Sequence, residues 1–160
     1  MDRATSDSGF TMIELMMVVV ILGVLATIAI ATFLRAREPA IDRSAQALLT
    51  SGVQAVHVVT ADNRSDVDVS LADLEQAEPA VKWRDGTASP EAASHEVSVA
   101  TGTTAGTGYI VLSTHTSNGE CLAVRDADTG APLYQRITGD VCPANAFDPA
   151  HGWVERWPPR

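Results

Sequence analysis

The hydrophobic and polar positions divide the chain into two parts. Residues 15–34 are twenty consecutive uncharged residues, and residues 10–13 extend this apolar run backwards across Glu14. A helix of twenty residues measures about 30 Å, which is the thickness of the hydrocarbon core of a bilayer. The run therefore predicts a membrane-spanning helix near the N-terminus.

Beyond the uncharged run, apolar residues recur about every 3.6 positions, as they do on one face of a helix. These residues are Ile41, Ala45, Leu48, Val53, Val56 and Val59. The period predicts that the helix continues to about residue 60. Pro39 lacks a backbone N–H and clashes with the preceding turn, so a bend is expected near residues 35–39. A short second helix is predicted from an N-cap at Ser70, supported by Asp73, to the residue before Pro79.

The last third of the chain alternates between apolar and polar residues, as strands do. Such segments begin at Glu96, Tyr109, Cys121 and Leu133, and turn residues such as Gly and Asn separate them. They predict an antiparallel meander of roughly four strands, whereas residues 83–87 are predicted to form a turn. An amphipathic helix and a half-polar sheet bury their apolar faces against each other. The predicted fold class is therefore α+β, with a long N-terminal helix packed on the sheet.

The charge of the chain is concentrated after the apolar run. The net charge is −9, and 17 of the 20 acidic residues follow residue 34. This part of the chain, after residue 34, is acidic and has no cluster of Lys and Arg. It therefore lacks the positive surface that phosphate backbones require. Nucleic acid is therefore not expected as a direct partner.

Motifs for catalysis or cofactor binding are absent from the sequence. It contains no HExxH, no Cys/His zinc spacing, no GxSxG and no phosphate-binding GxxxxGK[ST]. The sequence therefore predicts neither an enzyme nor a cofactor. Asp126 and Asp128 alternate in a turn and make a weak calcium candidate, because hard carboxylate oxygens suit that ion. An ordinary acidic hairpin turn is the more common interpretation of the same residues.

Glu14 is the unusual residue of the apolar segment. A carboxylate near the centre of a membrane-inserted helix costs about 2.5 to 3.5 kcal/mol unless it finds a partner, and the segment contains no Lys or Arg. A free α-amino group, created by a cut just before the helix, would supply one. Alternatively, Glu14 reaches the headgroup region near the helix N-terminus, where the helix dipole also favours an anion. Both interpretations remain open on these grounds.

The segment Gly9-Phe10-Thr11-Met12-Ile13-Glu14-Leu15 resembles the processing motif of type IV prepilins. In that family, a membrane peptidase cuts after the glycine on the cytoplasmic side and N-methylates the new terminal residue. The resemblance implies that the mature chain begins at Phe10 and that Glu14 pairs with the terminal amine of a neighbouring subunit. It also implies the partners: prepilin peptidase, other pilin subunits, an inner-membrane assembly platform and the membrane itself.

The resemblance also implies how the chain is divided into segments. It implies a cleaved leader at 1–9, a transmembrane and assembly helix at 10–34, and a pilin head at 35–160. Within the head we expect the helix to continue to about 60, a linker at 61–94, and the sheet with a two-cysteine C-terminal loop at 95–160. Gly23 starts a stripe of small residues at four-residue spacing that lets helices approach closely, so Phe10, Glu14 and Gly23 are the expected assembly residues.

Cys121 and Cys142 are the only cysteines of the chain. If the head is extracytoplasmic, an even count without a CxxC motif favours a disulfide, which would stabilise the fold by about 3 kcal/mol. The alternative is two reduced core thiols in a cytosolic protein. The family resemblance implies the first, since many pilin-like proteins close their last strands with such a loop.

The resemblance implies a structural subunit of a type IV pilus-like filament, or a secretion or competence pseudopilin of the same class. Such a subunit is a single-pass cytoplasmic membrane protein with an extracytoplasmic head, and becomes extracellular after assembly. The alternative is a membrane-tethered binding module or adhesin that does not polymerise. A cleavable secretory signal fits less well, because its apolar part is usually about 7 to 15 residues long and follows a basic region. Here the leader has only Arg3 against Asp2 and Asp7.

Overall fold

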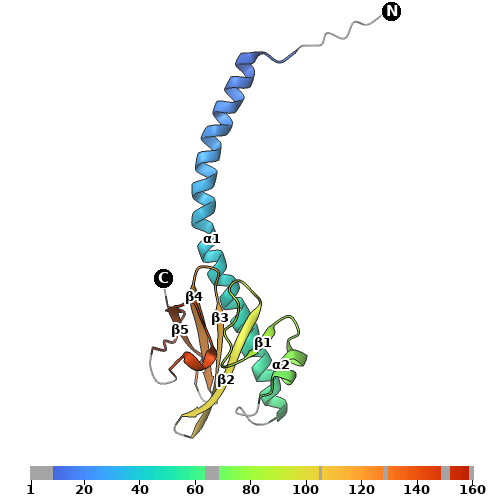
Figure 1. The fold of residues 1–160 in the computed structure, drawn as a ribbon, viewed down its shortest axis with the longest axis vertical. Coiled ribbons are helices and arrows are strands. Elements are labelled where there is room, and N and C mark those ends of the chain that lie inside the picture. The colour runs from blue at the N-terminus through green and yellow to red at the C-terminus, as the bar shows by residue number, and fades with distance from the viewer. Residues whose placement is uncertain (1–8, 64–68, 105, 128–129, 149–151, 159–160) are drawn as a thin grey trace, which may run out of the picture. The chain divides into compact units, whose positions relative to one another are not determined.

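The computed structural model describes residues 9–63, 69–104, 106–127, 130–148 and 152–158. In chain order the elements are α1 (Met12–Asn63), α2 (Leu71–Ala77), β1 (Lys82–Asp85), β2 (Glu96–Thr104), β3 (Thr107–His115), β4 (Glu120–Ala127), β5 (Leu133–Thr138) and the 3-10 helix η1 (Ala144–Ala146) (Figure 1). The chain divides after Pro39 into an N-terminal helical unit and a head.

The N-terminal unit consists of the apolar part of α1. The helix begins at Met12, and Pro39 lies inside it rather than ending it. Large apolar side chains from Phe10 to Leu34 are between 49% and 86% exposed. With a mean hydropathy of 2.8 over its most apolar window, α1 is long and apolar enough to cross a membrane. The predicted long apolar helix is confirmed.

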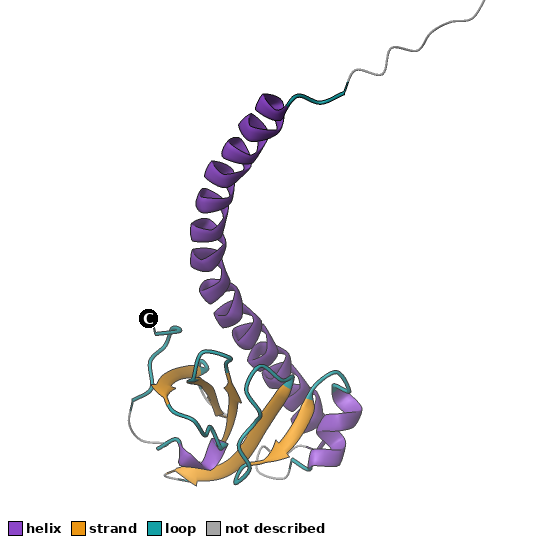
Figure 2. Ribbon diagram, turned by 45° about the horizontal axis from the view of Figure 1, so that its top comes forward, coloured by secondary structure: helices purple, strands orange, loops and turns teal. Residues whose placement is uncertain are grey.

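The head combines the second half of α1 with a five-stranded sheet in the order β1-β2-β3-β4-β5. The strands from β2 to β5 pair antiparallel, which confirms the predicted meander. Figure 2 shows these strands in orange, with α2 beside β1. The fold class is thus α+β, with a long N-terminal helix on a mostly antiparallel sheet.

One face of the sheet packs against α1. Alternate residues of β4 point to opposite faces, so Leu122 and Val124 join the helix side while Cys121 and Ala123 join the other. The core on the helix side contains Leu49, Ala55, Val56, Val59, Leu74, Val81, Trp83, Val97, Val99, Ile110, Leu112, Leu122 and Val124. The second face is also buried, because Cys142, Ala144 and Phe147 of the C-terminal segment cover it. The half-polar sheet expected from the alternation is therefore covered on both faces.

Gly52 sets how closely α1 approaches the sheet. A Cβ atom at this position would lie 3.1 Å from Leu112 Cδ1 and 3.5 Å from the Trp83 ring. The first distance is tighter than an ordinary van der Waals contact. The glycine, which costs helix stability by itself, therefore makes room for two core side chains.

The prediction of a turn at residues 83–87 is wrong for its first part. Lys82–Asp85 forms β1, which pairs parallel to β2 with Trp83 opposite Val97. Trp83 is 6% exposed, so burial of its indole in the core outweighs the local turn signal. The turn begins only at Asp85, whose carboxylate accepts hydrogen bonds from the Thr87 N–H and hydroxyl. The sheet gains its fifth strand in this way.

The predicted short helix is confirmed as α2. The Ser70 hydroxyl oxygen accepts the Asp73 N–H at 3.2 Å and donates its own proton to the Asp73 carboxylate at 2.7 Å. The first of these bonds satisfies one of the backbone N–H groups that the first turn of a helix cannot pair internally. The helix ends at Ala77, shortly before Pro79.

Candidate functional site

The first turn of α1 is closed by a reciprocal cap between Thr11 and Glu14. Glu14 Oε2 accepts hydrogen bonds from the Thr11 N–H at 2.9 Å and from the Thr11 hydroxyl at 2.8 Å. The Glu14 N–H donates to Thr11 Oγ1 at 3.3 Å, as in a capping box. Thr11 is therefore the N-cap of the helix, and Glu14 occupies its third position.

Sequence reasoning missed this cap, although its signal is present. The spacing Thr-x-x-Glu before an apolar run is the pattern of a capping box, and Thr11-Met12-Ile13-Glu14 fits it. The cap gives Glu14 a local role in addition to the two considered above. Both of its hydrogen bonds from Thr11 use one carboxylate oxygen, Oε2, and no other donor among the described residues bonds to Oε1.

Gly9 and Phe10 precede the helix and are both accessible. Phe10 is 86% exposed. Apart from its neighbours in the chain, a Cβ atom on Gly9 would meet no heavy atom of the described residues within 4 Å. The peptide bond between Gly9 and Phe10 therefore lies in a segment that an enzyme can reach, outside the helix.

The helix beyond Glu14 presents a surface with few unsatisfied polar groups. The Thr27 hydroxyl donates to the Val24 carbonyl at 2.7 Å, and the Thr32 hydroxyl donates to the Ala29 carbonyl at 2.9 Å. Such back-bonding hides hydroxyls from an apolar surrounding. Gly23 also lies open: apart from its chain neighbours and the backbone of its own helix, no atom of the described residues lies within 4 Å of its Cβ position. This surface suits either lipid or other helices.

The N-terminal part of the chain matches a known family model. Residues 5–30 match the prokaryotic N-terminal methylation motif. The chain carries the type IV prepilin signature. The match includes Gly9, Phe10, Glu14 and Gly23, while the head lies outside it. No curated protein and no solved structure matches the chain.

The prepilin signature covers the junction before Phe10 and also the capped residues Thr11 and Glu14. The signature implies cleavage by prepilin peptidase, and the family that it marks is structural rather than enzymatic. In this chain the expected junction lies two residues before α1 begins at Met12. The helix therefore needs no unwinding for a peptidase to reach the Gly9–Phe10 bond.

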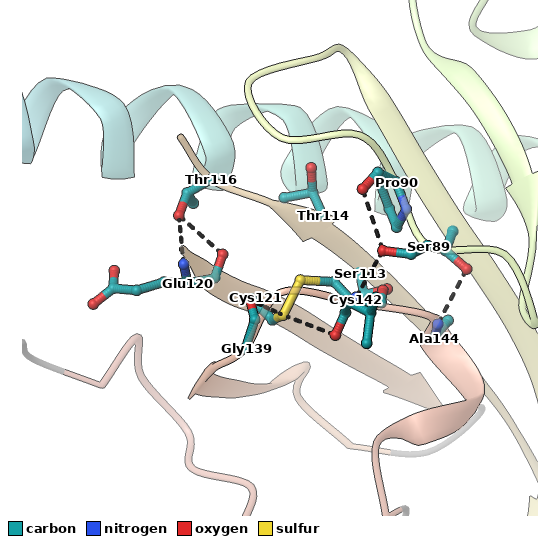
Figure 3. Close-up of a disulfide and its surroundings, with 12 residues drawn as sticks. Ser89, Pro90, Ser113, Thr114, Thr116, Glu120, Cys121, Gly139, Cys142 and Ala144 are labelled. Carbon is teal, nitrogen blue, oxygen red and sulfur yellow. Dashed lines mark hydrogen bonds between the residues drawn. A yellow bond between two sulfur atoms is a disulfide. The ribbon is translucent and has the colours of Figure 1, made fainter. Parts of the chain in front are cut away.

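The head contains a disulfide between Cys121 and Cys142, with Cα atoms 5.4 Å apart (Figure 3). Both cysteines are fully buried. Hydrogen bonds hold the second cysteine on the sheet, because Ser113 Oγ donates to the Cys142 carbonyl and the Cys142 N–H donates to Ser89 Oγ at 2.8 Å. The C-terminal segment is thereby attached covalently and through its backbone to the face of the sheet opposite α1.

The structure describes only Asp126 of the two residues in the weak calcium candidate. Asp126 Oδ2 lies 2.5 Å from His57 Nε2, while Asp128 lies outside the described residues. Within the described ranges, no group of three or more His, Cys, Asp or Glu residues could hold a metal ion. Asp126 therefore has a side-chain partner on α1, which the sequence could not reveal because 69 positions separate the two residues.

Proposed function

We propose that the chain is a structural subunit of a type IV pilus-like filament. In this proposal prepilin peptidase removes residues 1–9, the new amine of Phe10 is methylated, and α1 mediates assembly. The observation that carries it is the position of Glu14. This carboxylate stands at the start of an exposed apolar helix, four residues after the new N-terminus.

Charge neutralisation explains why cleavage and assembly are coupled. Before cleavage the Gly9–Phe10 peptide bond is uncharged, and residues 10–34 contain no cation to match Glu14. Cleavage creates an ammonium group on Phe10. An ammonium and a carboxylate that are each costly in an apolar surrounding become less costly when paired, so the Phe10 amine of one subunit is the natural partner for Glu14 of the next.

The Thr11 cap supports this pairing by orienting the carboxylate. Thr11 occupies Oε2 of Glu14 from its own helix. The other oxygen, Oε1, then receives the ammonium of the neighbouring subunit. A pre-oriented acceptor loses less conformational freedom on binding than a free side chain does.

Packing of the apolar helices supplies the rest of the assembly energy. Large side chains of residues 10–34 are exposed in the single chain and need a cover in any aqueous filament. Gly23 offers a point of close approach between helices. We assign Phe10, Glu14 and Gly23 to assembly.

The proposal places the chain as a single-pass protein of the cytoplasmic membrane before assembly. The head then faces the extracytoplasmic side. The oxidising conditions there favour the buried Cys121–Cys142 disulfide. The partners are prepilin peptidase, other pilin subunits and an inner-membrane assembly platform. The role is structural, without catalysis or a cofactor.

The mature N-terminus tests processing. We expect mass spectrometry of filaments sheared from cells to find chains that begin at Phe10 and carry one additional methyl group on the amine. Assembled chains that still contain residues 1–9 would contradict the proposal.

A substitution of Glu14 separates assembly from membrane tethering. Glu14→Ala is expected to abolish filaments while leaving the cleaved chain in the membrane, and Glu75→Ala, which removes an exposed carboxylate from α2, should assemble normally. Filaments are counted by electron microscopy and the chain by immunoblot. If wild-type and Glu14→Ala chains are equally displayed on the cell and neither forms filaments, the chain is a tethered binding module instead.

A further inference from the structure

The head contains a half-open pocket between α1 and the β4–β5 side of the sheet. Its volume is about 170 Å³. The walls come from three parts of the head: α1, the strands β4 and β5, and the C-terminal segment. The lining residues used below are Val53, Gln54, His57, Val124, Tyr134 and Trp157.

Two aromatic rings form the far wall of the pocket. The rings of Tyr134 and Trp157 have centroids 4.5 Å apart and planes inclined by 41°. Trp157 is held there because the C-terminal segment pairs with β5: the Tyr134 N–H donates to the Val154 carbonyl at 2.8 Å, and the Val154 N–H donates back at 3.0 Å. The indole is thus a built part of the wall.

Polar side chains of α1 also line the pocket. The His57 Nε2 atom contacts Asp126 Oδ2, which orients the imidazole, and among the described residues no side chain hydrogen-bonds to its Nδ1 atom. Gln54 is exposed on the same side of α1, three positions earlier. Val53, Val124 and the two rings make the interior apolar.

We propose that this pocket binds a small planar aromatic molecule with one hydrogen-bonding group, of the phenol class. An enclosed apolar cavity of about 150 Å³ accepts benzene, so a volume of about 170 Å³ suits one substituted ring. The ring packs on Tyr134 and Trp157, and its polar group bonds to His57 or Gln54 of the lining. All lining residues belong to the head, so this site is independent of the assembly function.

The test uses 4-fluorophenol and the full chain in nanodiscs of zwitterionic lipid. We expect saturable broadening of the fluorine signal of the probe. The indole N–H signal of Trp157 should shift in the 1H–15N spectrum, while those of Trp83 and Trp153 stay in place. Binding that does not saturate, or equal shifts of all three indoles, would overturn the proposal.

Two matched variants on α1 locate the probe. Val53→Phe fills the pocket and should weaken binding at least about tenfold, whereas Val58→Phe adds the same ring at a position that is 58% exposed and should bind as the wild type does. Trp157→Leu keeps an apolar wall without the ring and should also weaken binding. It supplies an independent test in case Val53→Phe perturbs the fold. Unchanged binding in both Val53→Phe and Trp157→Leu would show that the probe sits elsewhere, and would end the proposal.

Discussion

Glu14 accepts both of its hydrogen bonds from Thr11 with one carboxylate oxygen, Oε2. The carboxylate that we propose for assembly is therefore also part of the N-cap of its own helix. Thr11 orders the first turn of α1 directly beside the junction where cleavage is expected. The first prediction concerns this link.

Thr11→Val keeps the shape of the side chain but removes the hydroxyl that bonds Glu14. We expect the amides of Glu14 and Leu15 to exchange with deuterium several-fold faster in the purified chain, because a helix end without its cap opens more often. Thr11→Ser keeps the hydroxyl and should exchange as the wild type does. If Thr11→Val and Thr11→Ser exchange equally, the hydroxyl does not stabilise the first turn.

Arg136 joins α1 to the sheet through two carboxylates. Its guanidinium lies 3.2 Å from Asp42 and 2.5 Å from Glu120, and all three side chains are less than a fifth exposed. Arg136→Met should lower the free energy of unfolding by about 2–4 kcal/mol, because the substitution removes a cation that contacts two largely buried carboxylates. Urea unfolding followed by tryptophan fluorescence measures this loss.

The matched control for the ion pair is Arg43→Met, which removes an exposed arginine next to Asp42 in sequence. Its effect should stay within about 0.5 kcal/mol, as for most surface substitutions. Equal losses in both variants would mean that net charge, rather than the Arg136 contacts, governs stability here.

Glu96 gives the head a dependence on pH. The hydrogen bond from Arg84 at 2.7 Å and that from the Glu91 N–H at 3.0 Å lower the pKa of Glu96 below its ordinary value of 4.5. Because the folded state holds the proton more weakly than the unfolded chain does, the stabilisation is present above pH 4.5 and is lost as the pH falls through the lowered pKa.

Glu96→Gln isolates this contribution. The stability difference between wild type and variant should be largest near neutral pH and shrink steadily below roughly pH 4.5. Unfolding curves at a series of pH values measure it, and the carboxylate of Asp85, which also has a lowered pKa, is common to both chains. A difference that is the same at pH 7 and at roughly pH 3 would rule out the ionised form of Glu96 as its source.

The Cys121–Cys142 bond closes a loop with a sequence separation of 21. Replacing both cysteines with serine should cost about 3 kcal/mol in the free energy of unfolding, because the unfolded chain regains the freedom that the bond removes. The control is the reduced wild type, which should lose a similar amount. A double variant as stable as the oxidised wild type would show that the hydrogen bonds to Ser89 and Ser113 suffice to hold the loop.

Local signals determined much of this protein from the sequence alone. The uncharged run at 15–34 required a long apolar helix, and Gly9, Phe10 and Glu14 carried the prepilin signature that the comparison recognised. The Ser70 cap and the alternating segments from Glu96 onward likewise marked α2 and four strands. Each of these signals depends on neighbours within a few residues, where chain geometry is fixed.

The tertiary structure decided what depends on contacts between distant residues. Burial of Trp83 against the core turned an expected turn into β1, paired parallel to β2. The contacts of Arg136 with Asp42 and of His57 with Asp126, and the pocket bounded by Trp157, join residues far apart in the chain. No local pattern encodes such pairs, because they exist only once packing has fixed the register of the strands and the position of the second half of α1 on the sheet.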